Sequence, residues 1–211
     1  MSDAARILHD PPWPSVPRQR EAATFGMWVF LASEALFFGA LIAGYAVYRV
    51  LYPHDFAIAS QQTNILYGSI NTGLLITSSF TMTVAVQASE ARMRRLLIFA
   101  LVLTAAIGIA FIAVKMLEYK DDLDKHLLPG AHFALPSAAT RLFFGLYWVM
   151  TGVHAIHLAV GCLLTLALAW AIASRHEVSD SSKVSPIALY WHFVDTIWII
   201  LYALIYLPGR P

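Results

Sequence analysis

The chain has 211 residues, of which 59% are hydrophobic and 13% are charged, and its formal net charge is +1. Soluble domains carry about 25% charged residues, so this composition, with a mean hydropathy of +0.64, indicates an integral membrane protein. The near-neutral charge argues against a nucleic-acid partner, and the single cysteine, Cys162, excludes an intramolecular disulfide and a cysteine-rich metal site.

The first 22 residues form a polar segment that contains several prolines. This segment lacks the apolar core of a cleaved signal peptide, so we expect the first membrane span to act as its own insertion signal. The remaining residues, 23–209, are predicted to form one domain.

That domain is predicted to be an all-α bundle of five transmembrane helices. A helix needs ~20 mostly apolar residues to cross ~30 Å of hydrocarbon, and five stretches of the sequence meet this requirement. They are residues 24–51, 63–88, 93–119, 142–174 and 186–207. The second stretch is the least apolar, because it is rich in hydroxyl side chains that can bond within a helix or to a neighbour.

The connections between these spans are short, except for residues 120–140. This segment contains Asp121, Asp122 and Asp124 and is predicted to be a solvated loop. The basic cluster of Arg92, Arg94 and Arg95 favours a cytoplasmic N-terminus and a C-terminus on the periplasmic or outer side. Aromatic residues near the span ends are expected in interfacial belts: Tyr48, Tyr52, Tyr119, Tyr190, Trp191 and Tyr206.

Glu34 lies in the middle of the first predicted span. An ionised carboxylate at the bilayer centre costs roughly 2.5–3.5 kcal/mol on insertion scales. Two explanations remain open. Glu34 is a protonated carboxyl bonded to a neighbouring Ser, Thr or His of the bundle, or it exchanges protons or meets a partner.

His154 and His157 lie in the fourth span at i, i+3, on one face of the helix. Two neighbours on one face cannot bind a haem from opposite sides. A haem–copper centre needs more membrane histidines than this chain offers, and a dinuclear copper site needs paired cysteines. We therefore predict that the chain binds no metal, and that both histidines hydrogen-bond inside the bundle or touch lipid headgroups.

Two other pairs have the same i, i+3 spacing. His192 and Asp195 can pair near the membrane edge, either as a structural pair or as part of a proton or docking network. Lys115 and Glu118 can pair at the outer end of the third span, where we expect Lys115 to extend its amine towards water.

Three motifs occur together in this sequence: GMWVFLASEALFF at 26–38, TGVHAIH at 151–157 and YWHFVDTIW at 190–198. In this order they resemble subunit III of haem–copper respiratory oxidases, and KMLEY at 115–119 is similar to the family as well. The resemblance extends from Phe25 to Gly209. Larger members of the family have seven helices, and this chain resembles the five-helix bacterial form.

The resemblance implies an accessory subunit that holds no haem or copper itself. It implies packing against catalytic subunit I, near a proton-uptake path, in a complex that also contains subunit II and phospholipid. Glu34 matches the intramembrane carboxylate of the family, the one that carbodiimides modify. His192 and Asp195 are grouped with Glu34 as intramembrane ionisable residues with a possible proton role. The residues expected to be structural or in contact with lipid are Trp28, His154, His157, Lys115 and Glu118, and none of these residues is expected to be catalytic.

The resemblance further implies a multi-pass protein of the bacterial cytoplasmic membrane, in a complex that reduces O2 to water and pumps protons. Cytochrome c is the expected electron donor, and membership of a larger supercomplex stays open. The alternatives are a quinol-oxidase subunit III, a homologue associated with nitric-oxide reductase and, in a different class, a stand-alone proton-coupled transporter.

Overall fold

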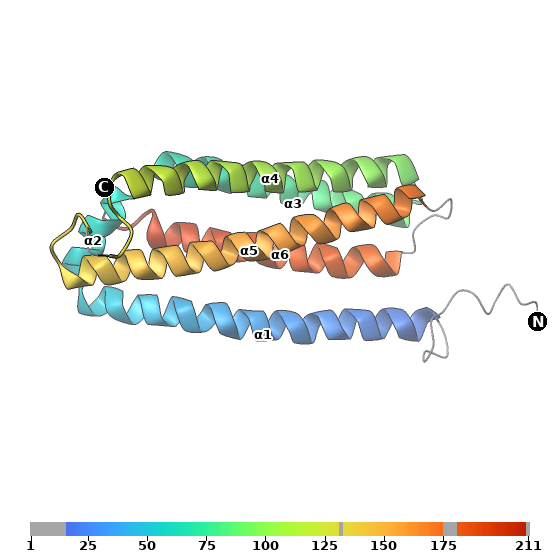
Figure 1. The fold of residues 1–211 in the computed structure, drawn as a ribbon. Coiled ribbons are helices and arrows are strands. Elements are labelled where there is room, and N and C mark those ends of the chain that lie inside the picture. The colour runs from blue at the N-terminus through green and yellow to red at the C-terminus, as the bar shows by residue number, and fades with distance from the viewer. Residues whose placement is uncertain (1–15, 131–132, 175–180, 210–211) are drawn as a thin grey trace, which may run out of the picture.

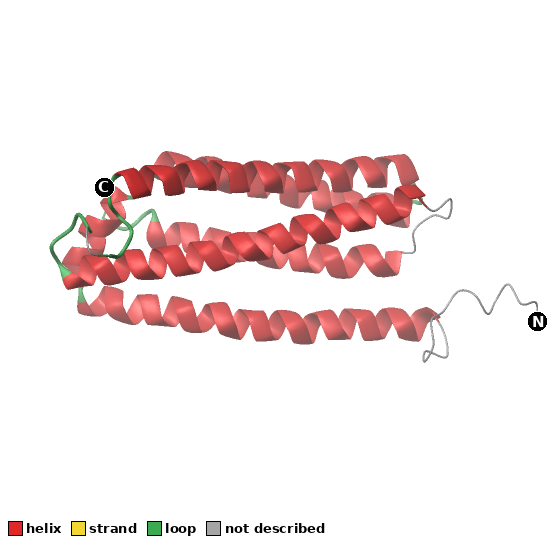
Figure 2. Ribbon diagram, viewed as in Figure 1, coloured by secondary structure: helices red, strands yellow, loops and turns green. Residues whose placement is uncertain are grey.

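The computed structural model describes residues 16–130, 133–174 and 181–209, and across these ranges the chain forms six helices and no strand (Figures 1 and 2). The helices are α1 (Val16–Leu51), α2 (Pro53–Gln62), α3 (Ile65–Glu90), α4 (Arg94–Asp124), α5 (Ala138–Ser174) and α6 (Ser181–Ile205). All except α2 contain a stretch that is long and apolar enough to cross a membrane. The predicted fold class, an all-α membrane protein with five spans, is confirmed.

Helix α2 is the element that the sequence did not predict. Its ten residues are too few and too polar to be recognised as a span. Pro53 occupies the start of the helix, where its fixed φ fits and its missing N–H costs nothing. Phe56 is buried against Phe143 of α5, with ring centroids 5.4 Å apart, and Ser60 donates a hydrogen bond of 2.6 Å to the Ile205 carbonyl. Helix α2 therefore closes one end of the bundle.

Helix α1 is attached along a narrow stripe. Its buried residues Leu31, Phe38 and Tyr45 recur every seven positions, and Glu34 lies on the same stripe between the first two. Only 11% of its most apolar stretch is buried, against 33–44% for the other four spans. In Figure 1, α1 lies along one side of the bundle, next to α5 and α6. Most of its apolar surface is thus open to lipid or to another subunit.

Trp191 of α6 fills the centre of the bundle. A Cβ atom on Gly108 of α4 would lie 2.9 Å from its ring, and a Cβ on Gly161 of α5 would lie 3.3 Å from it. The indole Nε1 donates a hydrogen bond of 3.1 Å to Ser78 of α3. The two glycines therefore let α4 and α5 close on a residue that is only 1% exposed.

The prediction of interfacial belts is wrong for three of its six residues. Tyr190, Trp191 and Tyr206 are at most 3% exposed, because the bundle covers them. Tyr48 and Tyr52 are exposed, as expected for belt residues.

Several hydroxyl groups of the hydroxyl-rich helix α3 bond to neighbouring helices, as the sequence predicted. Thr81 and Thr104 of α4 share a hydrogen bond of 2.7 Å, and Trp198 of α6 donates one of 3.1 Å to Thr72. Buried polar bonds of this kind hold membrane helices together, because lipid offers no competing partner.

The segment 120–140 differs from the predicted solvated loop. Helix α4 continues to Asp124, and Asp122 is only 1% exposed. The helix ends in a Schellman motif, in which the Leu127 N–H donates to the Asp122 carbonyl and His126 takes a φ of 54°. The acidic cluster is therefore divided: Asp124 faces outwards and Asp122 faces the core, because the two positions lie on different sides of α4.

Candidate functional site

Glu34 of α1 meets His157 of α5. The Glu34 Oε2 atom lies 3.0 Å from His157 Nε2, and both side chains are 19% exposed. The other ring nitrogen, His157 Nδ1, lies 2.9 Å from the Val153 carbonyl oxygen. Both the carboxyl and the imidazole thus gain a partner that lowers the cost of their position inside the membrane.

The bond to Val153 shows that Nδ1 of His157 carries a hydrogen. A carbonyl oxygen only accepts hydrogen bonds, so Nδ1 carries a hydrogen and donates it to Val153. If the ring is neutral, Nε2 is an acceptor and Glu34 donates its carboxyl proton. If the ring is charged, Nε2 donates to the carboxylate. In both forms one hydrogen lies between Glu34 and His157 across the 3.0 Å contact.

His154 has a different environment from His157. It has no exposed surface, its ring lies 5.6 Å from Phe111 and 5.1 Å from Trp198, and neither ring nitrogen has a hydrogen-bond partner among the described residues. We expected His154 either to form a hydrogen bond inside the bundle or to contact lipid headgroups, and its position matches neither expectation.

His192 and Asp195 do not pair with each other. Instead, His192 Nδ1 lies 2.8 Å from the hydroxyl of Ser79 on α3. Asp195 is 5% exposed, and neither carboxyl oxygen has a hydrogen-bond partner in the part of the chain that the structure describes. Asp195 also lies near the middle of the span Val184–Ile205 rather than at its edge.

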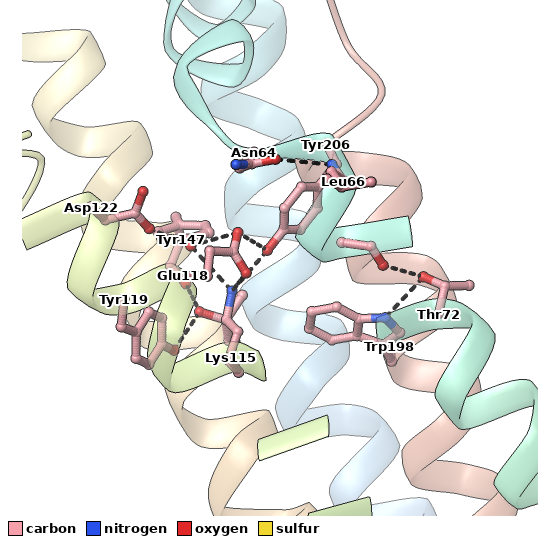
Figure 3. A network of polar contacts seen from close by, with 12 residues as sticks. Asn64, Leu66, Thr72, Lys115, Glu118, Tyr119, Asp122, Tyr147, Trp198 and Tyr206 are labelled. Carbon is pink, nitrogen blue, oxygen red and sulfur yellow. Dashed lines mark hydrogen bonds and ion pairs between the residues drawn. The ribbon is translucent and has the colours of Figure 1, made fainter. Parts of the chain in front are cut away.

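Lys115 and Glu118 form the expected ion pair, with 2.9 Å between Nζ and Oε2 (Figure 3). Both side chains are completely buried, so the expectation that Lys115 reaches water is wrong. The bundle end is covered by Tyr147 of α5 and Tyr206 after α6, and the lysine donates to both hydroxyls, at 3.1 and 2.7 Å.

The two tyrosines also connect the carboxyl groups. Tyr206 donates a hydrogen bond of 2.8 Å to Glu118 Oε1, and Tyr147 donates one of 2.7 Å to Asp122 Oδ2. Burial, reinforced by the charge of Glu118, holds the pKa of the Tyr206 phenol well above its ordinary value, so this group stays a donor. One cation therefore serves two carboxyl groups through a closed polar network.

Sequence reasoning missed most members of this network. Asp122 had a usable signal, because positions 115, 118 and 122 fall on one helical face. Tyr147 and Tyr206 had none, since they come from segments 32 and 91 residues away from Lys115.

The remaining candidate, Trp28, lies on the outer side of α1 and is 57% exposed. Among the residues with a described position, no three His, Cys, Asp or Glu side chains gather closely enough to hold a metal ion. That the chain binds no metal stays a prediction.

These features define a class: a multi-pass helical membrane protein that buries several ionisable side chains of its spans inside its own bundle. Within that class, residues 17–210 match the family model of cytochrome c oxidase subunit III, and the chain belongs to this family. The resemblance drawn from the three sequence motifs is confirmed.

Individual relatives agree with the family match. The chain is 34% identical to cytochrome c oxidase subunit 3 of Synechocystis sp. over 185 residues, which cover 87% of this chain and 74% of that protein. It is 33% identical to the subunit 3 of Thermostichus vulcanus, covering 88% and 87% of the two chains. Cytochrome bo(3) ubiquinol oxidase subunit 3 of Buchnera aphidicola is 24% identical, covering 90% and 96%.

We expect Glu34→Gln to leave the fold and the assembly of the subunit intact. An amide donates to His157 Nε2 in place of the protonated carboxyl, so the contact between α1 and α5 is kept. Treatment with a hydrophobic carbodiimide, followed by mass spectrometry of the peptide, should label the wild type at position 34 and leave the variant unlabelled there. Loss of the variant subunit from the purified complex would contradict this expectation.

Proposed function

We propose that this chain is the accessory subunit III of a bacterial cytochrome c oxidase in the cytoplasmic membrane. The family membership makes it a subunit of a haem–copper oxidase complex. We propose cytochrome c as the electron donor because of the sequence identities to relatives. The chain is 33–34% identical to two cytochrome c oxidase subunits and 24–26% identical to subunits of quinol oxidases. This grading is the observation that carries the choice of cytochrome c over quinol.

The proposed task is structural and electrostatic. Haem and copper in the partner subunits supply the reduction of O2 to water. This chain packs against catalytic subunit I, next to subunit II, with its N-terminus on the cytoplasmic side, and supports proton uptake there. Support comes from the Glu34–His157 pair, in which a carboxyl group and an imidazole lie 3.0 Å apart inside the first span. The open apolar face of α1, which suits a partner subunit or phospholipid, supports it as well.

Purification tests this proposal. An affinity tag on this chain, with extraction in a mild detergent, should recover a complex that has a reduced-minus-oxidised haem spectrum and oxidises reduced cytochrome c. Recovery of a complex that oxidises only quinol would favour the quinol-oxidase alternative. Recovery of the chain alone would favour a transporter.

Deletion of the chain gives a second expected result. Because its haem-free role is proposed from the family, the haem absorption bands of the partner subunits should stay nearly unchanged when the subunit is absent. The same membranes with the chain restored from a plasmid are the control. A missing haem band, with the catalytic polypeptide still present on a blot, would show that this chain contributes to a redox centre.

A further inference from the structure

A groove of about 340 Å³ lies between α3 and α6. Its lining includes Ser79, Phe80 and Thr83 of α3, and His192, Asp195 and Thr196 of α6. Asp195 lies near the middle of the span Val184–Ile205, so the groove lies at the depth of the bilayer centre. A surface at this depth meets either acyl chains or the helices of another protein.

The carboxyl group of Asp195 lacks a partner in this groove. The side chain is 5% exposed, and neither oxygen is hydrogen-bonded among the described residues. The Ser79 hydroxyl lies near this carboxyl group, but its hydrogen bond of 2.8 Å is made with His192 Nδ1. A carboxyl group at this depth is unfavourable without a hydrogen-bond partner, whether or not it is ionised.

The threonines of the groove also present oxygen atoms. Thr83 donates its hydroxyl hydrogen to the Ser79 carbonyl at 3.0 Å, and Thr196 donates its own to the His192 carbonyl at 2.8 Å. Each hydroxyl therefore keeps only lone pairs for an outside group. Ser79 and His192, which also line the groove, keep one donor hydrogen beyond the bond that they share, so the groove offers acceptors and a donor. Acyl chains have no polar group to pair with these side chains.

We propose that this groove receives a transmembrane helix of another subunit, which inserts an N–H or O–H side chain against Asp195. The complementarity is chemical: a groove that holds an unpaired carboxyl group at mid-membrane depth matches a helix that carries a polar side chain. A membrane helix can present such a side chain because its own backbone groups are already hydrogen-bonded. The identity of the partner as an oxidase subunit rests on the proposed function. The groove and the unpaired carboxyl group of Asp195 are observed independently of that proposal.

Photo-crosslinking in native membranes tests the occupant. Benzoylphenylalanine in place of Phe80, which is 69% exposed beside the groove, should yield an adduct with a second, different membrane polypeptide. The same replacement at Phe99 of α4, which is 64% exposed away from the groove, is the matched control for lipid exposure. Adducts of the Phe80 probe with lipid alone, or with a second copy of this chain, would overturn the proposal.

Substitution of Asp195 gives an independent readout. With the tag on the catalytic subunit, Asp195→Leu should lower the amount of this chain recovered in the complex about tenfold, whereas Asp195→Asn, which keeps an acceptor oxygen, should retain it. Equal recovery of the leucine variant and the wild type would count against the groove. If the leucine variant is absent from the membrane, the crosslink from position 80 in the otherwise native chain still tests whether a helix occupies the groove.

The two proposals fail separately. If the wild-type chain does not travel with any haem-bearing protein, the oxidase assignment is wrong, and the crosslink in native membranes still identifies the helix in the groove. If the chain does travel with the oxidase but the Phe80 probe reaches only lipid, the groove proposal alone is wrong.

Discussion

Replacing Lys115 with methionine is expected to destabilise the subunit by about 3–5 kcal/mol, because it leaves buried carboxyl groups without their cation. The amine is fully buried and bonded to Glu118, Tyr147 and Tyr206 at 2.7–3.1 Å. It also lies 4.7 Å from the centre of the Tyr147 ring, a distance that suits a cation–π contact. Methionine has a similar length but supplies neither charge nor donor. The measurement is the unfolding of the purified subunit by SDS in mixed micelles, followed by circular dichroism.

Two variants control this experiment. Lys120→Met makes the same change on the exposed side of α4 and should alter the stability by no more than about 0.5 kcal/mol. The double variant Lys115→Met with Glu118→Leu should be more stable than the single variant, because it removes the carboxylate that the lysine neutralised. An equal effect of Lys115→Met and Lys120→Met would show that the buried network contributes nothing to stability.

Trp191→Ala is expected to lower the stability by about 3–5 kcal/mol, the range for truncating a large buried aromatic side chain. The ring is 1% exposed and fills the space that Gly108 and Gly161 leave open between α4 and α5. Alanine would leave a cavity there and would deprive Ser78 of the indole N–H. The same SDS titration measures the loss.

Trp170 offers the matched control, because it undergoes the same substitution while 74% exposed on α5. Trp170→Ala should leave the stability nearly unchanged in mixed micelles. Trp191→Phe, which restores part of the volume without the N–H, should fall between the wild type and Trp191→Ala. If Trp191→Ala unfolds at the same SDS fraction as the wild type, the packing of α4 and α5 does not depend on this ring.

The number of membrane helices was predictable because bilayer thickness fixes the length of an apolar segment. Helix α2 was not predictable, since a stretch of ten residues, five of them polar, is too short and too polar to indicate a span. Its burial depends on Phe143, which lies far along the chain. The end of α4 was misjudged for a similar reason. Asp122 is polar and was expected in water, but Tyr147 supplies a donor inside the bundle.

The candidate site was predictable only where one helix decides the contact. The spacing of Lys115 and Glu118 is sufficient to pair them, since both lie on α4. The spacing of His192 and Asp195 permits a pair as well, but Ser79 of another helix binds the histidine instead. The partner of Glu34 was predicted as a type of residue, and its identity as His157 depends on how α1 and α5 meet.

The attachment of α1 has a consequence for biogenesis. Beyond the adjoining α2, its packing partners are α5 and α6, the last helices to be synthesised. The 123 residues from Glu34 to His157 take roughly 6–25 s to translate at about 5–20 residues per second. During this interval α1 has been synthesised, but the carboxyl group of Glu34 still lacks His157 as its partner. The nascent chain thus has a window in which a chaperone or an early-assembling neighbour can capture it.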